Sequence, residues 1–272
     1  MTYSTLMVHL DGARPNASVL DVAAKLAERH HAKMIGIAAC CPAVLGGNDP
    51  FMDGRLAVIE RDIVTDELAR AKVEFRGHIA LRPHVLEWRS IPTLENVTDT
   101  ICEQARCADL LITCANPLSG DLLTHADTGA LILKAGRPVL VVPDANVTAD
   151  FRNVVIAWND TRGCRRAIVD ALPILLLANR VTLVAASSDP GAAHSGIEDV
   201  GQWLDRHGIS SDRIISRAAG SASRTLNAVA AEVEADLVVA GAYGHSRIRE
   251  WAFGGVTRDL LLQEGRCTFL SH

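Results

Sequence analysis

The stretch LMVHLDGAR (Leu6–Arg14) recurs as VVIAWNDTR (Val154–Arg162), 148 residues farther along the chain, and this repeat decides the fold. In both copies an apolar run leads into a polar turn. At the same offset, IGIAA (Ile35–Ala39) falls on LVAAS (Leu183–Ser187), so each copy continues with a second apolar strand after an intervening helix. Self-similarity over this length predicts two copies of one structural unit.

Farther along, the two copies differ in length. ADLLITCA (Ala108–Ala115) matches ADLVVAGA (Ala235–Ala242) at an offset of 127, and GRPVLVVP (Gly136–Pro143) matches GRCTFLSH (Gly265–His272) at an offset of 129. The first copy thus carries 21 additional residues in its middle and is 2 residues shorter after its fourth strand. We predict one domain over residues 1–144, a polar linker over 145–150 and a second domain over 151–272.

Each copy alternates short β-rich runs with helical patterns, which is typical of βαβ units and a parallel sheet. The additional residues predict a long second helix over about residues 53–77, in which Leu56, Ile59 and Ile63 keep helical spacing. The turn-rich stretch before it, residues 40–50, is interpreted as a connection rather than a lid. Two further stripes are expected to face the core: Leu94, Val97 and Ile101 in the first copy, and Leu226, Val229, Ala230 and Val233 in the second.

Composition narrows the class of protein. Of the 272 residues 49% are hydrophobic and only 4% are aromatic, which is typical of parallel strands between helices. A net charge of −5 without charged blocks gives no support to a nucleic-acid surface or a polybasic membrane patch. The seven cysteines include no C-x-x-C pair, and the N-terminus shows no signal-peptide pattern. We therefore expect a cytoplasmic protein with no nucleic-acid or membrane partner and no metal site of its own.

A glycine motif follows the fourth strand of the second copy. In GAYGHSRIREWAFGGVT, the residues Gly241, Gly244 and Gly254 are spaced G-x2-G-x9-G, and Gly255, Val256 and Thr257 open a final helix. Glycines after a parallel strand let the backbone approach a ligand closely, and a new helix presents free N–H groups. The pattern favours a phosphate site. On spacing alone, a tight strand-to-helix loop without a ligand remains the alternative.

With its repeat, its five strands per copy and this motif, nearly the whole chain resembles the universal stress protein (UspA-like) family in its tandem form. The family motif is G-x2-G-x9-G-[ST], and Gly255 stands where Ser or Thr is expected, with the Thr257 hydroxyl two positions on. The resemblance implies an α/β fold of two tandem doubly wound, Rossmann-like domains. Each would be a five-stranded parallel sheet of order 3-2-1-4-5, and Val139–Val142 would pair with Thr268–Ser271 to form a pseudo-dimer.

The resemblance also implies that the second domain binds ATP or ADP, with or without Mg²⁺. The loop Gly241–Gly244 and the segment Gly254–Thr257 would hold the ribose and phosphates. Asn159, which stands where the family usually has Asp, and the backbone at Ala185 would meet the adenine. His245 either contacts phosphate or is an ordinary loop residue.

The first domain departs from the motif. It keeps Asp11 at the end of its first strand, but Cys114 and Pro117 replace the first two glycines, and His125 and Ala126 stand where the glycine pair is expected. We therefore interpret the first domain as degenerate for nucleotide binding.

Other polar and sulfur-containing residues have plainer interpretations. His30 and His31 are expected to form a solvated helix cap rather than a metal site, and Cys102 and Cys107 to be buried packing thiols rather than a redox couple. Trp158 either walls the pocket or plugs a strand end. A P-loop is excluded because the chain has no Gly-Lys dipeptide, and a dinucleotide fingerprint is absent after either first strand.

These observations predict a cytoplasmic stress-response protein whose C-terminal domain binds ATP or ADP and acts as a nucleotide-dependent switch or interaction protein. We expect an unidentified protein partner and an intramolecular pseudo-dimer that can pair into a homodimer. No catalytic residues stand out, so turnover beyond slow ATP hydrolysis is not expected. The alternatives are a protein-interaction module that binds no nucleotide, and an enzyme that hydrolyses a nucleotide or another small molecule.

Overall fold

The computed structural model describes residues 2–42, 54–79, 86–115, 125–145, 147–187, 190–217, 222–242 and 265–272. By their internal contacts, the residues divide into two compact units, Tyr3–Val139 and, with the first two residues, Leu140–His272. The division falls inside one strand, and the domain boundary expected at residue 144 stays a prediction. We call the two units the N-terminal and the C-terminal unit.

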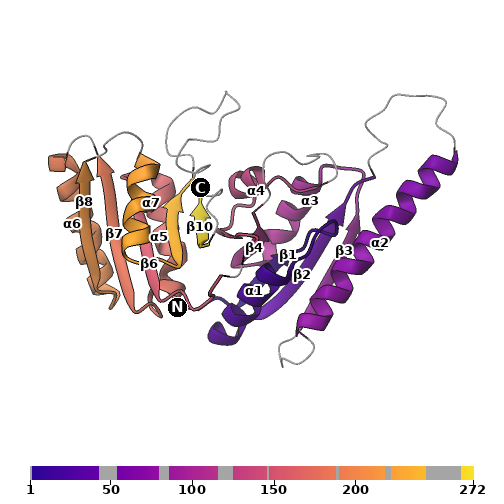
Figure 1. The fold of residues 1–272 in the computed structure, drawn as a ribbon, viewed down its shortest axis with the longest axis horizontal. Coiled ribbons are helices and arrows are strands. Elements are labelled where there is room, and N and C mark those ends of the chain that lie inside the picture. The colour runs from indigo at the N-terminus through magenta and orange to yellow at the C-terminus, as the bar shows by residue number, and fades with distance from the viewer. Residues whose placement is uncertain are drawn as a thin grey trace. The chain divides into compact units, whose positions relative to one another are not determined.

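Both halves of the chain alternate strands and helices, and in the described residues the order is the same up to the fourth strand of each half (Figure 1). The first half contains β1 (Thr5–His9), α1 (Ala17–His30), β2 (Lys33–Cys40), α2 (Gly54–Ile79), β3 (Leu86–Pro92), α3 (Val97–Gln104), the 3-10 turn η2 (Ala105–Cys107), β4 (Leu110–Cys114), α4 (Thr128–Lys134) and β5 (Val139–Val142). The second contains β6 (Asn153–Trp158), α5 (Arg162–Leu175), β7 (Arg180–Ser187), α6 (Pro190–Arg206), β8 (Ser211–Arg217), α7 (Ala222–Glu232), β9 (Leu237–Gly241) and β10 (Cys267–Ser271).

The sheet of each half has the predicted order. The first half reads β3-β2-β1-β4-β5 and the second reads β8-β7-β6-β9-β10, which is 3-2-1-4-5 in both. The pairs β1–β2, β1–β4 and β2–β3 run parallel, as do β6–β7, β6–β9, β7–β8 and β9–β10. The prediction of two doubly wound α/β sheets is confirmed. The pairing expected between Val139–Val142 and Thr268–Ser271 concerns how the units sit together and stays a prediction.

Buried strands explain why the composition is rich in aliphatic residues. Every residue of β4 and β5 is buried, and in β2 only Lys33 is exposed. Strands covered by helices on both faces read as continuous apolar runs. The core also explains Gly36 in β2, because a Cβ there would lie 2.7 Å from the ring of Phe75 on α2.

Two sequence expectations about helices are wrong in part. Leu94 is 76% exposed and precedes α3, because Asn96 caps the helix by accepting a hydrogen bond from the N–H of Asp99. Val97 and Ile101 of the same stripe are fully buried, as expected. In the second stripe Leu226, Val229 and Ala230 are buried, whereas Val233 lies beyond the end of α7 and is half-buried.

Of the two histidines at the end of α1, His31 is an exposed cap residue as expected, whereas His30 is not solvated. His31 ends the helix in a left-handed conformation with φ 52°, but His30 is buried, and its ring packs edge-on against Tyr3 at 5.0 Å. Burial lowers the pKa of His30 to about 4, with the charge of Arg29 adding to the effect, so the imidazole is neutral at pH 7. The apolar packing of α1 thus includes a neutral histidine.

The two cysteines near the end of α3 are not both buried. Cys107 is exposed and its Sγ accepts a hydrogen bond from Arg89 at 3.3 Å, while Cys102 is half-buried. Burial raises the pKa of Cys102 to about 11. The expectation of two buried packing thiols is therefore wrong, because the 3-10 turn carries Cys107 out of the helix core.

Candidate functional site

In the C-terminal unit the candidate site lies where the strand order reverses. β6 has β7 on one side and β9 on the other, although the chain reaches β9 only after β8. Ligands of open α/β sheets bind at the carboxyl ends of the strands at such a point. The register brings these ends together, because Ala157 pairs with Ala240 and Trp158 pairs with Ala185. Asn159 follows β6 directly and is exposed at this edge.

Thr161 holds the turn that carries Asn159. The Thr161 hydroxyl donates to Oδ1 of Asn159 at 2.8 Å and accepts from the N–H of Cys164 at 3.3 Å, which caps the N-terminus of α5. The N–H of Thr161 also donates to the carbonyl of Asn159 at 2.7 Å. The amide of Asn159 is thereby oriented at the sheet edge, where it offers a donor and an acceptor without a charge.

Gly241, the first glycine of the motif, is required by packing. A Cβ on Gly241 would lie 2.6 Å from the carbonyl carbon of Gly163 and would also clash with the N–H of Cys164. A Cβ on Gly163 would in turn meet the carbonyl of Ala242 at 3.2 Å. These two glycines let the first turn of α5 lie directly against the end of β9. Gly241 therefore has a structural reason that does not depend on a ligand.

The structure also locates Ala185 and Trp158. Ala185 lies inside β7, paired with Trp158 on one side and Ile215 on the other, two residues before the strand ends. Trp158 is buried, and a Cβ on Gly196 of α6 would lie 3.4 Å from its Nε1. The indole thus packs between β6 and α6, which favours the interpretation that it plugs the strand end. The remaining predicted site residues lie outside the described residues: Gly244, His245, Gly254, Gly255, Val256 and Thr257.

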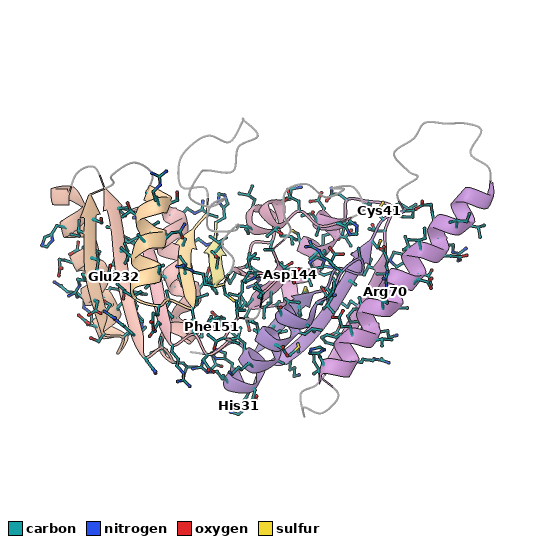
Figure 2. The ribbon with its side chains drawn as sticks, in the orientation of Figure 1. His31, Cys41, Arg70, Asp144, Phe151 and Glu232 are labelled. Carbon is teal, nitrogen blue, oxygen red and sulfur yellow. The ribbon has the colours of Figure 1, made fainter. Side chains whose placement is uncertain are left out.

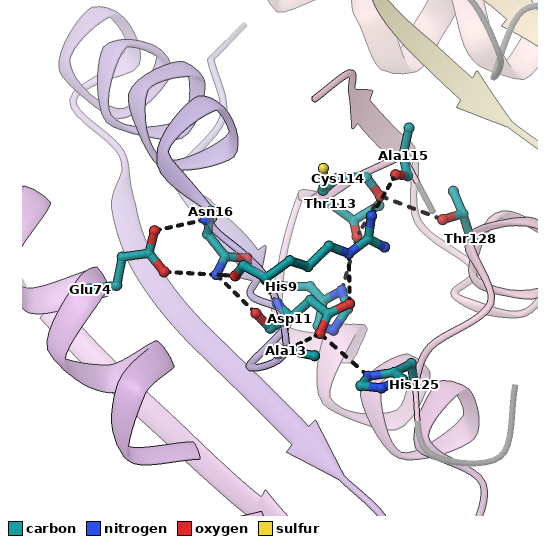
Figure 3. A network of polar contacts seen from close by, with 11 residues as sticks. His9, Asp11, Ala13, Asn16, Glu74, Thr113, Cys114, Ala115, His125 and Thr128 are labelled. Carbon is teal, nitrogen blue, oxygen red and sulfur yellow. Dashed lines mark hydrogen bonds and ion pairs between the residues drawn. The ribbon is translucent and has the colours of Figure 1, made fainter. Parts of the chain in front are cut away.

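The corresponding place in the N-terminal unit holds a network of charged side chains (Figure 3). Asp11, just after β1, accepts at Oδ1 from the N–H of Ala13 at 2.9 Å and lies 3.3 Å from Nδ1 of His125. Its Oδ2 accepts from Nε of Arg14 at 3.0 Å. Arg14 also donates to the carbonyl of Ala115, after β4, at 3.4 Å. Both oxygens of Asp11 are therefore bound by groups of the chain itself.

A second layer of contacts fixes the turn that carries Asp11. Asn16 accepts from the N–H of Asp11 at 2.9 Å and donates to the carbonyls of Asp11 and Arg14. Glu74 of α2 accepts from both the backbone N–H and the side-chain amide of Asn16, at 2.7 and 2.9 Å. A Cβ on Gly12 would lie 2.8 Å from the carbonyl oxygen of Glu67, so α2 lies directly on this turn. The long helix of the first half thus supports the network.

The electrostatics of the network favour the ionised pair. Burial alone would raise the pKa of Asp11, but hydrogen bonds from His125, Ala13 and Arg14 outweigh it and hold that pKa well below its usual range. The hydrogen bond and charge of Asp11, with the charge of Glu67, raise the pKa of His125 against the opposing effects of burial and Arg14. Each partner stabilises the charged form of the other.

His9 lies beside this pair but is neutral. Its Nδ1 is 2.9 Å from Oγ1 of Thr113 on β4, and its ring is 7% exposed. Burial lowers the pKa of His9 to about 4. The charge of Asp11 opposes this shift, and the charges of Arg14 and His125 add to it. Together with Asp11, Arg14 and Thr113, His9 lines a cavity of about 10 Å³, close to the least volume that holds one water molecule.

Sequence reasoning found Asp11 and noted His125 only as a departure from the glycine motif. It missed His9, Arg14 and Thr113. The sequence did contain one signal for Arg14. Arg14 and Arg162 occupy the same place in the two copies, three residues after Asp11 and Asn159 respectively. In the described part of the chain, no three His, Cys, Asp or Glu side chains are grouped as metal ligands would be. None of the described helices combines the length and apolar character of a membrane span.

Fold and sites together define the class of protein: a tandem pair of doubly wound α/β units, each with polar residues at the reversal of its strand order. A universal stress protein from Archaeoglobus fulgidus DSM 4304 has this fold, with a TM-score of 0.72 and 10% identity over 98% of this chain and 97% of that one. The chain therefore has the fold of tandem universal stress proteins.

Two Pseudomonas aeruginosa structures are also similar over nearly the whole chain. A functionally unknown protein from strain PAO1 has a TM-score of 0.61 and 14% identity over 99% of this chain and 92% of that one. A protein from strain UCBPP-PA14, provisionally named a universal stress protein, has a TM-score of 0.60 and 15% identity over 98% and 92%. No family model matches the sequence, and no curated protein does.

Proposed function

We propose that the C-terminal unit binds ATP or ADP, with or without Mg²⁺, and that the protein is a cytoplasmic nucleotide-dependent switch or interaction protein of the stress response. One observation carries the proposal. The exposed amide of Asn159 stands at the strand-order reversal, beside the end of β9, from which the G-x2-G-x9-G motif continues. The same edge of the sheet therefore carries a polar group that suits the base and the beginning of a glycine motif that suits the phosphates.

In this proposal Asn159 hydrogen-bonds the adenine, and the edge of the sheet at Ala185 lies against the base. The segments Gly241–Gly244 with His245 and Gly254–Thr257 hold the ribose and the phosphates. Backbone N–H groups suit a phosphate because they donate without requiring a cation. The assignment follows the resemblance of the glycine motif to that of the universal stress protein family, whose tandem fold this chain has.

The N-terminal unit is assigned no nucleotide. Asp11 stands where Asn159 stands in the other unit, but its oxygens already accept from Ala13, Arg14 and His125. A nucleotide there would have to displace an ion pair and fit where the cavity holds about one water molecule. We therefore expect one nucleotide per chain.

Isothermal titration of the full chain with ATP and with ADP tests the proposal. The wild type should bind one equivalent, and Gly244→Val should lose measurable binding because a branched side chain fills the backbone approach that the phosphates need. Gly77→Val is the matched control, since a Cβ there meets nothing within 4 Å and the residue lies on α2. It should bind like the wild type.

Two outcomes would replace the proposal. No heat and no thermal shift with ATP or ADP at millimolar concentration would favour an interaction module without nucleotide. Steady phosphate release that persists after contaminating ATPases are removed, and that Gly244→Val abolishes, would favour an enzyme.

A further inference from the structure

Helix α2 has two apolar faces, and only one of them is used by the N-terminal unit. The inner face carries Val64, Leu68, Ala71 and Phe75, all buried, and packs on β2, β3 and α1. This contact accounts for one side of the helix. In Figure 1 the helix runs along β3 at the end of that unit, and side chains project from it along its length (Figure 2).

The outer face carries large apolar side chains that the unit leaves in solvent. Val58, Ile59, Ile63 and Val73 are 58%, 54%, 46% and 72% exposed. Ile59 lies nine residues before the buried Leu68, which is two and a half helical turns, so the two point in opposite directions. Ile59, Asp66 and Val73 follow one another at intervals of seven residues and form one line, with Ile63 beside Ile59.

Helix stability does not explain these residues. All four are β-branched, and Val and Ile form helices less readily than Ala, Leu, Lys or Glu. A solvated helix face gains nothing from them. Val58, Ile59 and Ile63 adjoin one another on the helix surface, and an exposed apolar cluster of this kind is typical of a contact surface. The face is therefore built for burial against something.

The charges on this face indicate what covers it. Asp62 and Asp66 lie in its first half, and Arg70 and Arg76 lie in its second half. All four are exposed, and none forms an ion pair with another residue in the part of the chain that the structure describes. A second helix α2 laid antiparallel would place its basic half on this acidic half. The same arrangement brings Ile59 and Ile63 of one copy near Val73 of the other.

We propose that a second copy of this chain docks on the outer face of α2, so that the two helices pair antiparallel about a two-fold axis between Asp66 and Arg70, with Asp66 of each copy opposite Arg70 of the other. Two-fold dimers use the same patch on both subunits, as a self-complementary face requires. Four apolar side chains per copy make a small interface, so the dimer is weak and depends on concentration. This docking does not rest on the proposed nucleotide site.

Analytical ultracentrifugation of the full chain tests the proposal. The wild type should shift from 29.1 kDa toward twice that mass as its concentration rises to about 1 mM. Val73→Glu should remain at 29.1 kDa over the same range. Val169→Glu is the matched control, because Val169 is 50% exposed on α5 and outside this face, and it should dimerise like the wild type. Circular dichroism confirms that each variant is folded.

Charge reversal identifies the partner as a second copy. A variant with Asp62→Arg and Asp66→Arg is basic at all four of these positions, and one with Arg70→Asp and Arg76→Asp is acidic at all four. Each alone should be monomeric, and an equimolar mixture should form a 1:1 heterodimer. A wild type that stays monomeric at about 1 mM overturns the proposal. A dimer that survives Val73→Glu, or mixed variants that do not associate, also overturns it.

Discussion

The carboxylate of Asp11 lies 3.3 Å from Nδ1 of His125, although one residue follows the first strand and the other precedes α4. In the C-terminal unit the place of Asp11 is taken by the uncharged Asn159, whose amide is exposed. The same point of the same fold thus carries an ion pair in one unit and an exposed, uncharged amide in the other. This difference accounts for our expectation that only one unit binds a ligand.

Replacement of His125 by Gln should lower the free energy of unfolding by about 1 kcal/mol at pH 5.5, since the pair is partly exposed. The folded pKa of His125 is raised, so the stabilisation is fully present below about pH 6.5 and is lost as the pH rises through the folded value. Asp11 stays ionised throughout this range. Urea unfolding of both proteins between pH 5 and 9 measures the difference.

His78→Gln is the control for this substitution. His78 also faces a carboxylate, Asp21 at 3.7 Å, but the two side chains are 34% and 71% exposed. It should change stability by less than about 0.5 kcal/mol at every pH. A His125→Gln deficit that does not shrink at high pH would contradict the ion pair.

Replacement of His9 by Asn should make stability less sensitive to acid. The folded pKa of His9 is about 4, below the unfolded value of about 6.5, so protonation favours the unfolded chain and stability falls as the pH drops between these values. Asn can keep a hydrogen bond to Thr113 because its amide reaches the position of Nδ1. The slope of unfolding free energy against pH should decrease by up to about 1.4 kcal/mol per pH unit.

Proton NMR provides a direct check on His9. Its imidazole resonances should not titrate near pH 6.5, whereas a solvent-exposed histidine should. Titration of His9 near that pH, or an unchanged slope in His9→Asn, would show that the buried neutral ring is not the native state.

Replacement of Gly241 by Ala should destabilise the C-terminal unit by about 2–4 kcal/mol, because the new Cβ would overlap the backbone of α5. Gly77→Ala is the matched control, since its Cβ meets nothing within 4 Å. In a helix this change should be neutral or stabilise by up to about 1 kcal/mol. Thermal unfolding without nucleotide measures both. If Gly241→Ala is as stable as the wild type, packing against α5 does not require the glycine, and the packing explanation is wrong.

Replacement of Thr161 by Ala should have two effects. Loss of the N-cap of α5 should cost about 1 kcal/mol of stability, and loss of the hydrogen bond to Asn159 should weaken ATP binding, since the amide is no longer oriented. Thr161→Ser keeps the hydroxyl and should retain both. Unfolding and isothermal titration on the same samples separate the effects. Equal ATP affinity in Thr161→Ala and Thr161→Ser would remove Asn159 from the proposed site.

Much of the fold was predictable because it depends on local pattern. Apolar runs such as Leu110–Cys114 and Leu237–Gly241 are strands that are buried from both faces, and their spacing by helices predicts parallel pairing. Leu94 was misjudged because capping by Asn96, which depends on one side-chain geometry, ends the periodic stripe. His30 was misjudged because sequence position says nothing of the Tyr3 ring that covers it.

Sequence alone determined that this protein is a tandem repeat of two parallel α/β units and that a glycine motif follows the fourth strand of the second. Both features depend on apolar runs and on glycine spacing, which can be read directly from the amino-acid sequence. Only the tertiary structure decided what each unit presents at its strand-order reversal. Asp11, Arg14 and His125 meet because strands distant in sequence end at one edge, and Gly241 is required by a helix that begins nearly 80 residues earlier. Contacts of this kind depend on packing in three dimensions, which no local pattern encodes.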